Sequence, residues 1–296
     1  MRTGRIGWWV STAFLPLALV GATSDALEID GLPEATDPQM RRFAVVFDFD
    51  TDSCYPSPAI SPAGQLNPGL SVTGRDPSFV SGCRSSAQLT NSNTYHRRAV
   101  IKKGGVTYEV RMYALYFMKD KDLPLWQAEG GGGHRHDWEF ALVWITDGRM
   151  THASYSAHGR VTTKAVSDLS FDGWCPECVK VVYHKDGGST HAMRFAETNE
   201  PPENDAGKWL TPALVDWYGM PVDLRTALNA FDYGHSNCSV CDGNFPYELR
   251  KGPPPGYPNK DEWQAAAGKN PSILRPGIDV LKESVEHDKA TVEEKP

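Results

Sequence analysis

Residues 130–145 read GGGGHRHDWEFALVWI, in which a glycine run, a dense polar motif and an apolar run follow one another directly. The apolar run, residues 140–145, contains aromatic, β-branched and aliphatic side chains and no charge, a pattern typical of a buried β-strand. Two imidazoles and two carboxylates stand immediately before it. The stretch therefore predicts a polar site at the start of a core strand.

The polar motif can hold a cation if the strand begins near Asp137. Strand alternation then places Asp137 and Glu139 on one face, and His136 and Trp138 on the other. His134 precedes the strand on a glycine hinge that can aim its ring at the two acids. Carboxylates with one imidazole suit Mg²⁺, Ca²⁺ or Mn²⁺ better than zinc or copper. The alternative is a charged β-edge with ordinary salt bridges, but the density of polar residues favours a site.

The remainder of the chain predicts a mainly β fold. Further strands are expected at residues 43–49, 106–117, 151–155 and 179–183, which are rich in aromatic and β-branched residues. Helices are expected to begin near Pro212 and Pro221. After Pro221, apolar residues recur at helical spacing from Leu224 to Phe231. Short strands with few helices favour a central β-sandwich flanked by helices.

The N-terminus carries the pattern of a secretory signal peptide over residues 1–22. Arg2 and Arg5 precede an apolar segment, residues 8–20, and small residues follow it. This apolar segment is too short and too interrupted for a membrane span. The 296 residues, 40% of them hydrophobic, are sufficient for a sizeable core.

The net charge argues against several partners. It is −7, and removal of Arg2 and Arg5 with the leader would lower it to −9 (−7 minus two positive charges). An acidic secreted protein is a poor candidate for nucleic acid or for electrostatic capture by anionic lipid. Membrane recognition would therefore depend on specific headgroups.

The chain contains six cysteines, which in an exported protein indicate disulfides. Four of them form two Cys-x-x-Cys pairs, Cys175/Cys178 and Cys238/Cys241. Such pairs would suggest zinc in a cytosolic protein. Here disulfides within or between the pairs are expected, and the sequence leaves the connectivity open.

The composition changes after Arg250. Residues 251–258 read KGPPPGYP, typical of a linker, and residues 259–296 are highly charged. We therefore expect one globular domain over residues 23–250, followed by a linker and a mostly disordered tail over residues 251–296.

Residues 133–139, GHRHDWE, match the signature heptapeptide of the necrosis- and ethylene-inducing peptide 1-like proteins, secreted cytolysins of plant-associated microbes. Other segments also resemble this family between about residues 40 and 250, namely residues 111–120, 156–159, 232–234, 242–245, 54–56 and 82–84. The resemblance implies a β-sandwich similar to actinoporins and fungal lectins. It also implies a disulfide between Cys54 and Cys83, which would brace the loop-rich residues 50–95.

The resemblance further implies a set of metal ligands. Carried over residue by residue, these are Asp120, His134, Asp137 and Glu139, with Mg²⁺ or Ca²⁺ as the expected cation. The spacing from Asp120 to His134 is longer than in the family, so Asp122 is an alternative ligand. Arg135, His136 and Trp138 are expected to brace the site or contact a ligand rather than bind metal.

Three more residues are candidates on weaker grounds. His158 lies in the matched SAHG element, and His191 follows a glycine pair, so each could line the same cavity. For His158 the sequence does not separate a structural role from a place in the cavity. For His191 it favours the structural role. Trp126, beside the glycine run, is a candidate for an exposed aromatic that contacts a membrane or a sugar.

The function implied by the resemblance is not enzymatic. It is recognition of plant glycosylinositol phosphorylceramide sphingolipids through the bound cation, followed by damage to the outer leaflet of the plasma membrane. A member without toxicity could still be sensed by a plant pattern-recognition receptor through residues 109–139. The alternative is a secreted metal-dependent hydrolase, since His134-x-His136-Asp137 is similar to a binuclear metal motif, with His158 and His191 as further ligands.

Overall fold

The computed structural model describes residues 29–72, 78–121, 132–187 and 190–269. The predicted signal peptide, Asp122 and Trp126 lie outside these residues, as do Gly130, Gly131 and the tail from residue 270. None of the helices in the described part of the chain is long and apolar enough to cross a membrane.

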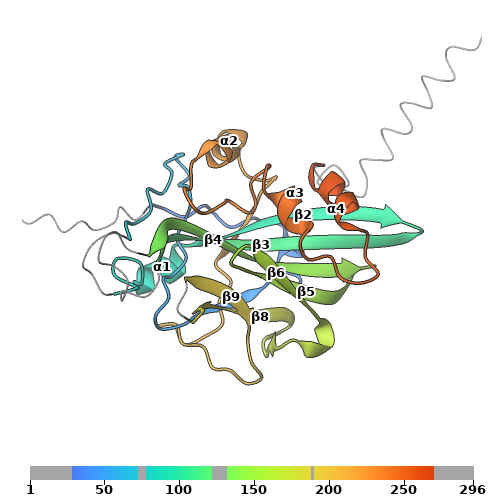
Figure 1. Cartoon of the computed structure of the whole chain (residues 1–296), viewed down its shortest axis with the longest axis horizontal. Coiled ribbons are helices and arrows are strands. Elements are labelled where there is room, and N and C mark those ends of the chain that lie inside the picture. Colours follow the sequence, from blue (N-terminus) through green and yellow to red (C-terminus); the bar gives the residue numbers. More distant parts are fainter. Residues whose placement is uncertain (1–28, 73–77, 122–131, 188–189, 270–296) are drawn as a thin grey trace, which may run out of the picture.

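The fold is mainly β and contains two sheets (Figure 1). The larger sheet has six strands in the order β10-β2-β3-β4-β5-β6. Its strands are β10 (Ala213–Asp216), β2 (Asn93–Lys103), β3 (Val106–Lys121), β4 (Gly133–Thr146), β5 (Arg149–Ala157) and β6 (Arg160–Ala165). The smaller sheet has the order β1-β8-β7, and β9 also pairs with β8. Its strands are β1 (Val46–Phe49), β7 (Phe171–Asp172), β8 (Cys175–Lys185) and β9 (His191–Phe195).

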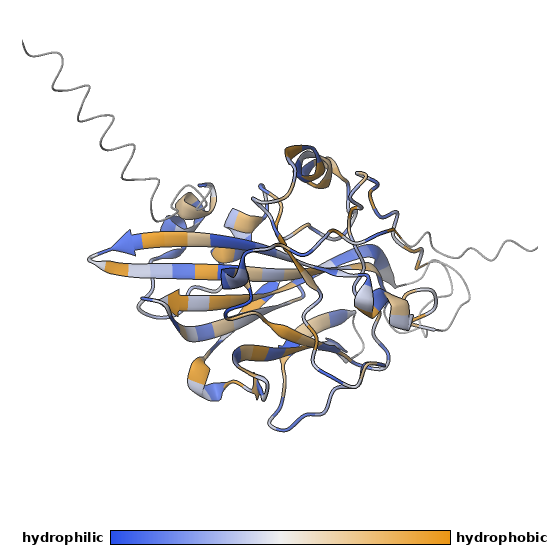
Figure 2. Ribbon diagram, turned by 180° about the vertical axis from the view of Figure 1, so that it is seen from behind, coloured by the Kyte–Doolittle hydropathy of each residue, from blue (hydrophilic) through white to orange (hydrophobic). Residues whose placement is uncertain are grey.

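Aromatic side chains fill the space between the sheets. The rings of Phe117 on β3 and Tyr183 on β8 stack with centroids 3.9 Å apart, and Phe49 on β1 packs edge-on against Phe117. Every residue of β4 from Phe140 to Ile145 is buried, as the apolar run predicts. Figure 2 shows hydrophobic and hydrophilic residues alternating along several strands, which is how one sheet presents different side chains to its two faces.

Helices α3 and α4 lie on the other face of the larger sheet (Figure 1). The α-helices are α1 (Ser86–Thr90), α2 (Val222–Ala230), α3 (Phe245–Leu249) and α4 (Lys260–Ala267), and short 3₁₀ turns occur at Pro38–Met40 and Val166–Asp168. Helix α4 packs on β2 and α3. Its fully buried Trp263 meets Trp144 of β4 edge-on, with ring centroids 5.4 Å apart. The prediction of a sandwich flanked by helices is therefore confirmed.

Two sequence predictions are wrong. No helix begins at Pro212; the residues after it form β10, which pairs in parallel with β2 at the edge of the sheet. Proline is tolerated there because it stands just before an edge strand and need not donate a ladder hydrogen bond. A disordered tail does not begin at residue 251 either, because residues 251–269 continue the domain and end in α4. The predicted helix after Pro221 is α2.

Three disulfides join the six cysteines. They are Cys54–Cys83, Cys175–Cys178 and Cys238–Cys241, so both Cys-x-x-Cys pairs close within themselves. The first connects two loops that carry little regular structure, and Tyr55 donates its backbone N–H to the carbonyl of Cys83.

Candidate metal centre

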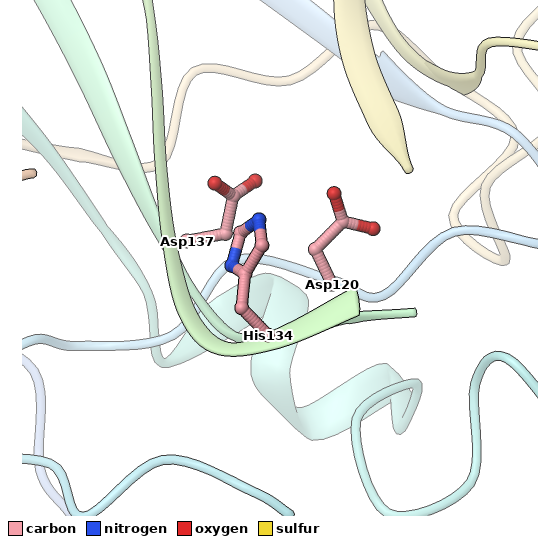
Figure 3. A group of neighbouring side chains, drawn as sticks. All are labelled: Asp120, His134 and Asp137. Carbon is pink, nitrogen blue, oxygen red and sulfur yellow. The ribbon is translucent and has the colours of Figure 1, made fainter. Parts of the chain in front are cut away.

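The antiparallel pairing of β3 and β4 assembles the candidate site. In this register Asp120 stands opposite His134, and Phe117 opposite Asp137. Ligand atoms of Asp120, His134 and Asp137 all lie within 4.8 Å of one another. Figure 3 shows the three side chains converging from the end of β3 and the start of β4. Two carboxylates and one imidazole form a donor set that suits a hard or borderline divalent cation.

Gly133 permits this close approach. Its φ is +97°, a conformation that L side chains rarely adopt. A Cβ at this position would lie 2.2 Å from the carbonyl oxygen of Asp120 and 2.7 Å from Cα of Lys121. Only glycine can therefore stand where β4 begins beside the end of β3.

The ring of His134 is oriented by its own strand. Its Nδ1 lies 2.7 Å from the carbonyl oxygen of His136, which can only accept a hydrogen bond. In the neutral ring this contact assigns the proton to Nδ1 and leaves Nε2 with a lone pair. A histidine that donates through one nitrogen and binds through the other is the usual arrangement in metal sites.

His191 holds Asp120 in place. Its backbone N–H lies 3.0 and 2.8 Å from the two carboxylate oxygens of Asp120, and its ring Nδ1 lies 2.7 Å from Oδ1. Its Nε2 lies 3.2 Å from the carbonyl oxygen of Asp52. His191 is buried at the start of β9, in the smaller sheet. It therefore orients a candidate ligand rather than standing as a separate structural histidine.

Asp137 is buried beside a second carboxylate. Burial and the charge of Asp120 raise the pKa of Asp137 from 3.8 to about 7, against the lowering effects of His134 and of a hydrogen bond from Tyr183. That bond runs from the Tyr183 hydroxyl to Oδ2 over 3.0 Å. Two buried acids held this close raise the free energy of the fold when both are ionised, and a bound divalent cation would relieve the repulsion. The environment thus fits a cation.

Glu139 lines the same cavity but stands apart from the other three ligand candidates. It is buried, and its Oε2 accepts a hydrogen bond from the Ser156 hydroxyl, whose oxygen in turn accepts one from the backbone N–H of Phe140. Burial and the neighbouring Asp137 raise the pKa of Glu139 well above its ordinary value. The alternation expected from the sequence places Asp137 and Glu139 on the cavity side, but only Asp137 joins the close group.

His136 and Trp138 point the other way, into an aromatic cluster. The ring of His136 lies 5.3 Å from that of Phe231, and its Nδ1 lies 2.7 Å from the Tyr116 hydroxyl. Burial lowers the pKa of His136 to about 4, with a further contribution from Arg135. Trp138 packs on Tyr116, Tyr95 and Tyr233. Arg135 is exposed and donates to the carbonyl of Pro68. These residues support the strand from behind.

A cavity of about 590 Å³ opens above the site. Its lining includes the acids and histidines described above, and the C-terminal segment contributes polar residues between His235 and Lys251. His158 also lines the cavity, in the two-residue turn between β5 and β6, where it and Gly159 both have positive φ. The His158 ring bonds to Asp186 over 3.0 Å. The structure therefore places both weaker histidine candidates at this cavity.

Sequence reasoning gave no role to Tyr183 or Ser156, which bond to Asp137 and Glu139. Tyr183 lies in a predicted strand. There the sequence does not distinguish a tyrosine that bonds to a site from one that only packs in the core. Ser156 belongs to the quoted SAHG element, so a signal for it was present. The cavity wall from the C-terminal segment depends on tertiary packing that no local pattern encodes.

The fold and site together define a β-sandwich protein with a candidate cation centre, two carboxylates and one imidazole, at the rim of its larger sheet. Residues 37–252 match the family model of the necrosis inducing proteins (NPP1), so the chain belongs to this family. NLP effector protein 2 from Phytophthora capsici is 32% identical over 208 residues, which cover 68% of this chain and 73% of the relative.

Solved structures agree with the fold. A non-toxic protein, HaNLP3, superposes with a TM-score of 0.60 at 25% identity, covering 77% of this chain and 99% of the other. NLPPya in complex with mannosamine superposes with a TM-score of 0.59 at 25% identity, covering 77% and 97%. One relative of this fold is thus described as non-toxic and another as binding an amino sugar.

Proposed function

We propose that this protein is a secreted, non-enzymatic cytolysin that recognises sphingolipid headgroups of the plant plasma membrane through a bound divalent cation, Mg²⁺ or Ca²⁺. The observation that carries the proposal is the convergence of Asp120, His134 and Asp137 at the base of a cavity large enough for a sugar. The mannosamine complex of a relative supports a sugar as the ligand. The predicted signal peptide and the effector names of relatives support secretion.

Asp120, His134 and Asp137 would hold the cation, and Glu139 would face it across the cavity. When bound, the cation supplies coordination positions for neighbouring hydroxyls of a sugar. Tyr183 and His191 keep the two aspartates oriented before any ligand arrives. The glycosylinositol phosphorylceramides of the outer leaflet carry the sugar headgroup expected from the family resemblance. Because the net charge is −7, recognition would depend on this headgroup rather than on electrostatic attraction to anionic lipid.

The alternative, a binuclear hydrolase, would need His158 and His191 as ligands of a second metal. His158 is paired with Asp186 and His191 with Asp120. Within the described ranges, one group of residues has the spacing of a metal site. This arrangement supports the non-enzymatic proposal.

Isothermal titration calorimetry of the mature protein with Mg²⁺ and Ca²⁺ tests the centre. Binding of one cation is expected, Asp137→Ala should abolish it, and Asp168→Ala, which removes an exposed carboxylate in a 3₁₀ turn elsewhere, should not. Equal cation affinity in wild type and Asp137→Ala would overturn the proposed centre.

Membrane activity needs a separate assay. Dye release from vesicles that contain plant glycosylinositol phosphorylceramides, with no release from phosphatidylcholine vesicles, is expected for the cytolysin. Ion leakage from infiltrated leaves then decides whether this member is toxic. Turnover of an ester or phosphodiester that depends on Asp137 would favour the hydrolase instead.

A further inference from the structure

The β7–β8 hairpin carries the most exposed large apolar side chain among the described residues. Trp174 is 98% exposed, and the next in order, Val222, is 67% exposed. Trp174 stands with Gly173 in the two-residue turn that joins the two strands. Turns favour small or polar residues, and an indole left in water contributes no burial energy. The fold therefore gives no reason for a tryptophan at this position.

The hairpin tip, residues 172–178, is braced on two sides. The register of the β7–β8 pairing shifts here, so residues 176–178 bulge out of the hairpin. The Cys175–Cys178 disulfide closes this bulge. Glu177, within the bulge, pairs with Arg42 over 3.4 Å, which connects the tip to the segment before β1. The indole is thus presented to solvent at the end of a braced hairpin.

The sequence around Trp174 is acidic. Residues 165–179 contain the acids Asp168, Asp172 and Glu177 and no lysine or arginine. Carboxylate oxygens accept hydrogen bonds from hydroxyl groups. They also repel anionic lipids and polymers of uronic acids. A partner at the tip should therefore be uncharged and rich in hydroxyl groups.

The apolar surface at the tip is small. Besides Trp174, the large apolar side chains exposed among the described residues are those of Val166, Val222 and Tyr247, and the last two lie on α2 and α3. A stable protein–protein interface needs about 800 Å² on each partner and an apolar centre. One indole does not supply that area, but it covers one face of a sugar ring, whose C–H groups pack on an aromatic surface. The tip fits a sugar chain better than a folded protein.

The tip lies away from the candidate metal centre. Strand β8 begins at the tip with Cys175 and ends with Lys185, which pairs with His191 beside Asp120. At about 3.3 Å per residue, the regular part of β8 after the bulge, from Val179 to Lys185, alone spans roughly 20 Å. A partner at the tip therefore leaves the cavity free.

We propose that the hairpin tip is a second binding site, which attaches this protein to a neutral polysaccharide. Sugar rings stack on Trp174, and their hydroxyls donate hydrogen bonds to Asp172. A single stacked ring binds weakly, with a dissociation constant on the order of 1 mM. A polymer repeats the same unit many times, so it retains the protein through a high local concentration of sites. This activity goes beyond the proposed function, because it needs neither the cation nor the cavity.

Affinity electrophoresis tests the proposal in native gels that contain hydroxyethylcellulose, laminarin or polygalacturonate, with EDTA present to remove divalent cations. Mobility is measured relative to a gel without polymer. Wild type should be retarded by at least one of the two neutral polymers and not by polygalacturonate. Trp174→Ala should weaken the binding constant by about tenfold or more. Trp174→Phe, which keeps an aromatic ring, should weaken it less.

Two controls lie outside the tip. Val222→Ala shortens an exposed apolar side chain at the start of α2, and Asp137→Asn alters the candidate metal centre. Both variants should be retarded as wild type is. NMR of the indole N–H groups adds a direct readout, because the cross-peak missing from Trp174→Phe identifies Trp174. Cellohexaose should shift this cross-peak in the presence of EDTA.

Several outcomes would overturn the second site. They are equal retardation of Trp174→Ala and wild type, retardation that EDTA abolishes, which would assign the glycan to the cavity, and no retardation of wild type by either neutral polymer. Vesicles of phosphatidylcholine test the competing partner. If no polymer retards wild type and Trp174→Ala loses binding to these vesicles, the tip contacts a lipid surface and the polysaccharide site is wrong. None of these outcomes changes the calorimetric test of the cation centre.

Discussion

Strand β4 has two halves that differ in almost every physical respect. From Phe140 to Ile145 it is buried among apolar side chains, and Trp144 is enclosed by Tyr257 and Trp263. From His134 to Glu139 it buries carboxylates whose pKa values are raised. The first half lowers the free energy of the fold, and the second raises it when its carboxylates are ionised without a counter-ion. Mutations in the two halves of the strand should therefore have opposite effects on stability.

The largest effect is expected in the apolar half. Trp144→Ala removes a fully buried ring and leaves the Ser154 hydroxyl without its indole partner, so the free energy of unfolding should fall by about 3–5 kcal/mol. Chemical denaturation measures this loss. Trp174→Ala, at a fully solvated tryptophan, should change it by less than about 0.5 kcal/mol. Cation affinity of the folded fraction should stay at the wild-type value in both variants.

Asp137→Asn should have the opposite signature. It keeps an oxygen that accepts the hydrogen bond of Tyr183 and removes a buried charge beside Asp120. Without metal at pH 8, this variant should be more stable than wild type by roughly 1–3 kcal/mol. Its cation affinity should fall by about 100-fold or more. If the metal-free variant were less stable than wild type, the carboxylate would be a net stabilising group, and the contrast between the halves would be wrong.

The pH dependence separates the halves further. Because the folded pKa of Asp137 is raised to about 7, its contribution to stability without metal is fully present below 3.8 and is lost as the pH rises through about 7. Cation binding requires the carboxylate, so affinity should fall by up to about tenfold per pH unit below pH 7. The melting temperature difference with and without Mg²⁺ should therefore be larger at pH 8 than at pH 6. In Asp137→Asn this difference should be small at both values.

A smaller effect is expected at Glu139. Because its carboxylate bonds to Ser156 outside the close group of ligands, Glu139→Gln should weaken the cation by about tenfold or less, well below the effect of Asp137→Asn. Calorimetry at pH 8 compares the two. Equal losses would place Glu139 among the direct ligands, as the family resemblance implies.

The sequence predicts what is local in this site. His134 and Asp137 stand three residues apart, and the apolar run beside them indicates their strand, so their proximity can be read from the chain. Tyr183 reaches Asp137 from β8 and Tyr247 reaches the cavity from α3, and only packing brings them there. A hydrophobic pattern specifies that a strand is buried but not which distant side chain meets it.

The C-terminal helix was missed for a different reason. The proline-rich residues 251–258 before it have the composition of a linker, which predicts disorder. This composition conflicts with a helix-start pattern in the residues that follow. Asn259 and Glu262 form a capping box at the start of α4, a pattern visible in the sequence. The burial of Trp263 could not be inferred, because its partner Trp144 lies more than a hundred residues earlier in the chain.

The space beside Gly133 has a consequence for how this protein can change over generations. Any single-base change in a glycine codon that yields another amino acid introduces a Cβ, and here that atom would meet the backbone of Asp120. Gly104 and Gly105, in a turn at the other end of β3, have open space around them. In a library of all single substitutions, position 133 should therefore reject every replacement, while the turn, whose glycines also have positive φ, should accept residues that adopt it, such as Asn and Asp. The residue at this site that tolerates substitution least is therefore the one without a side chain.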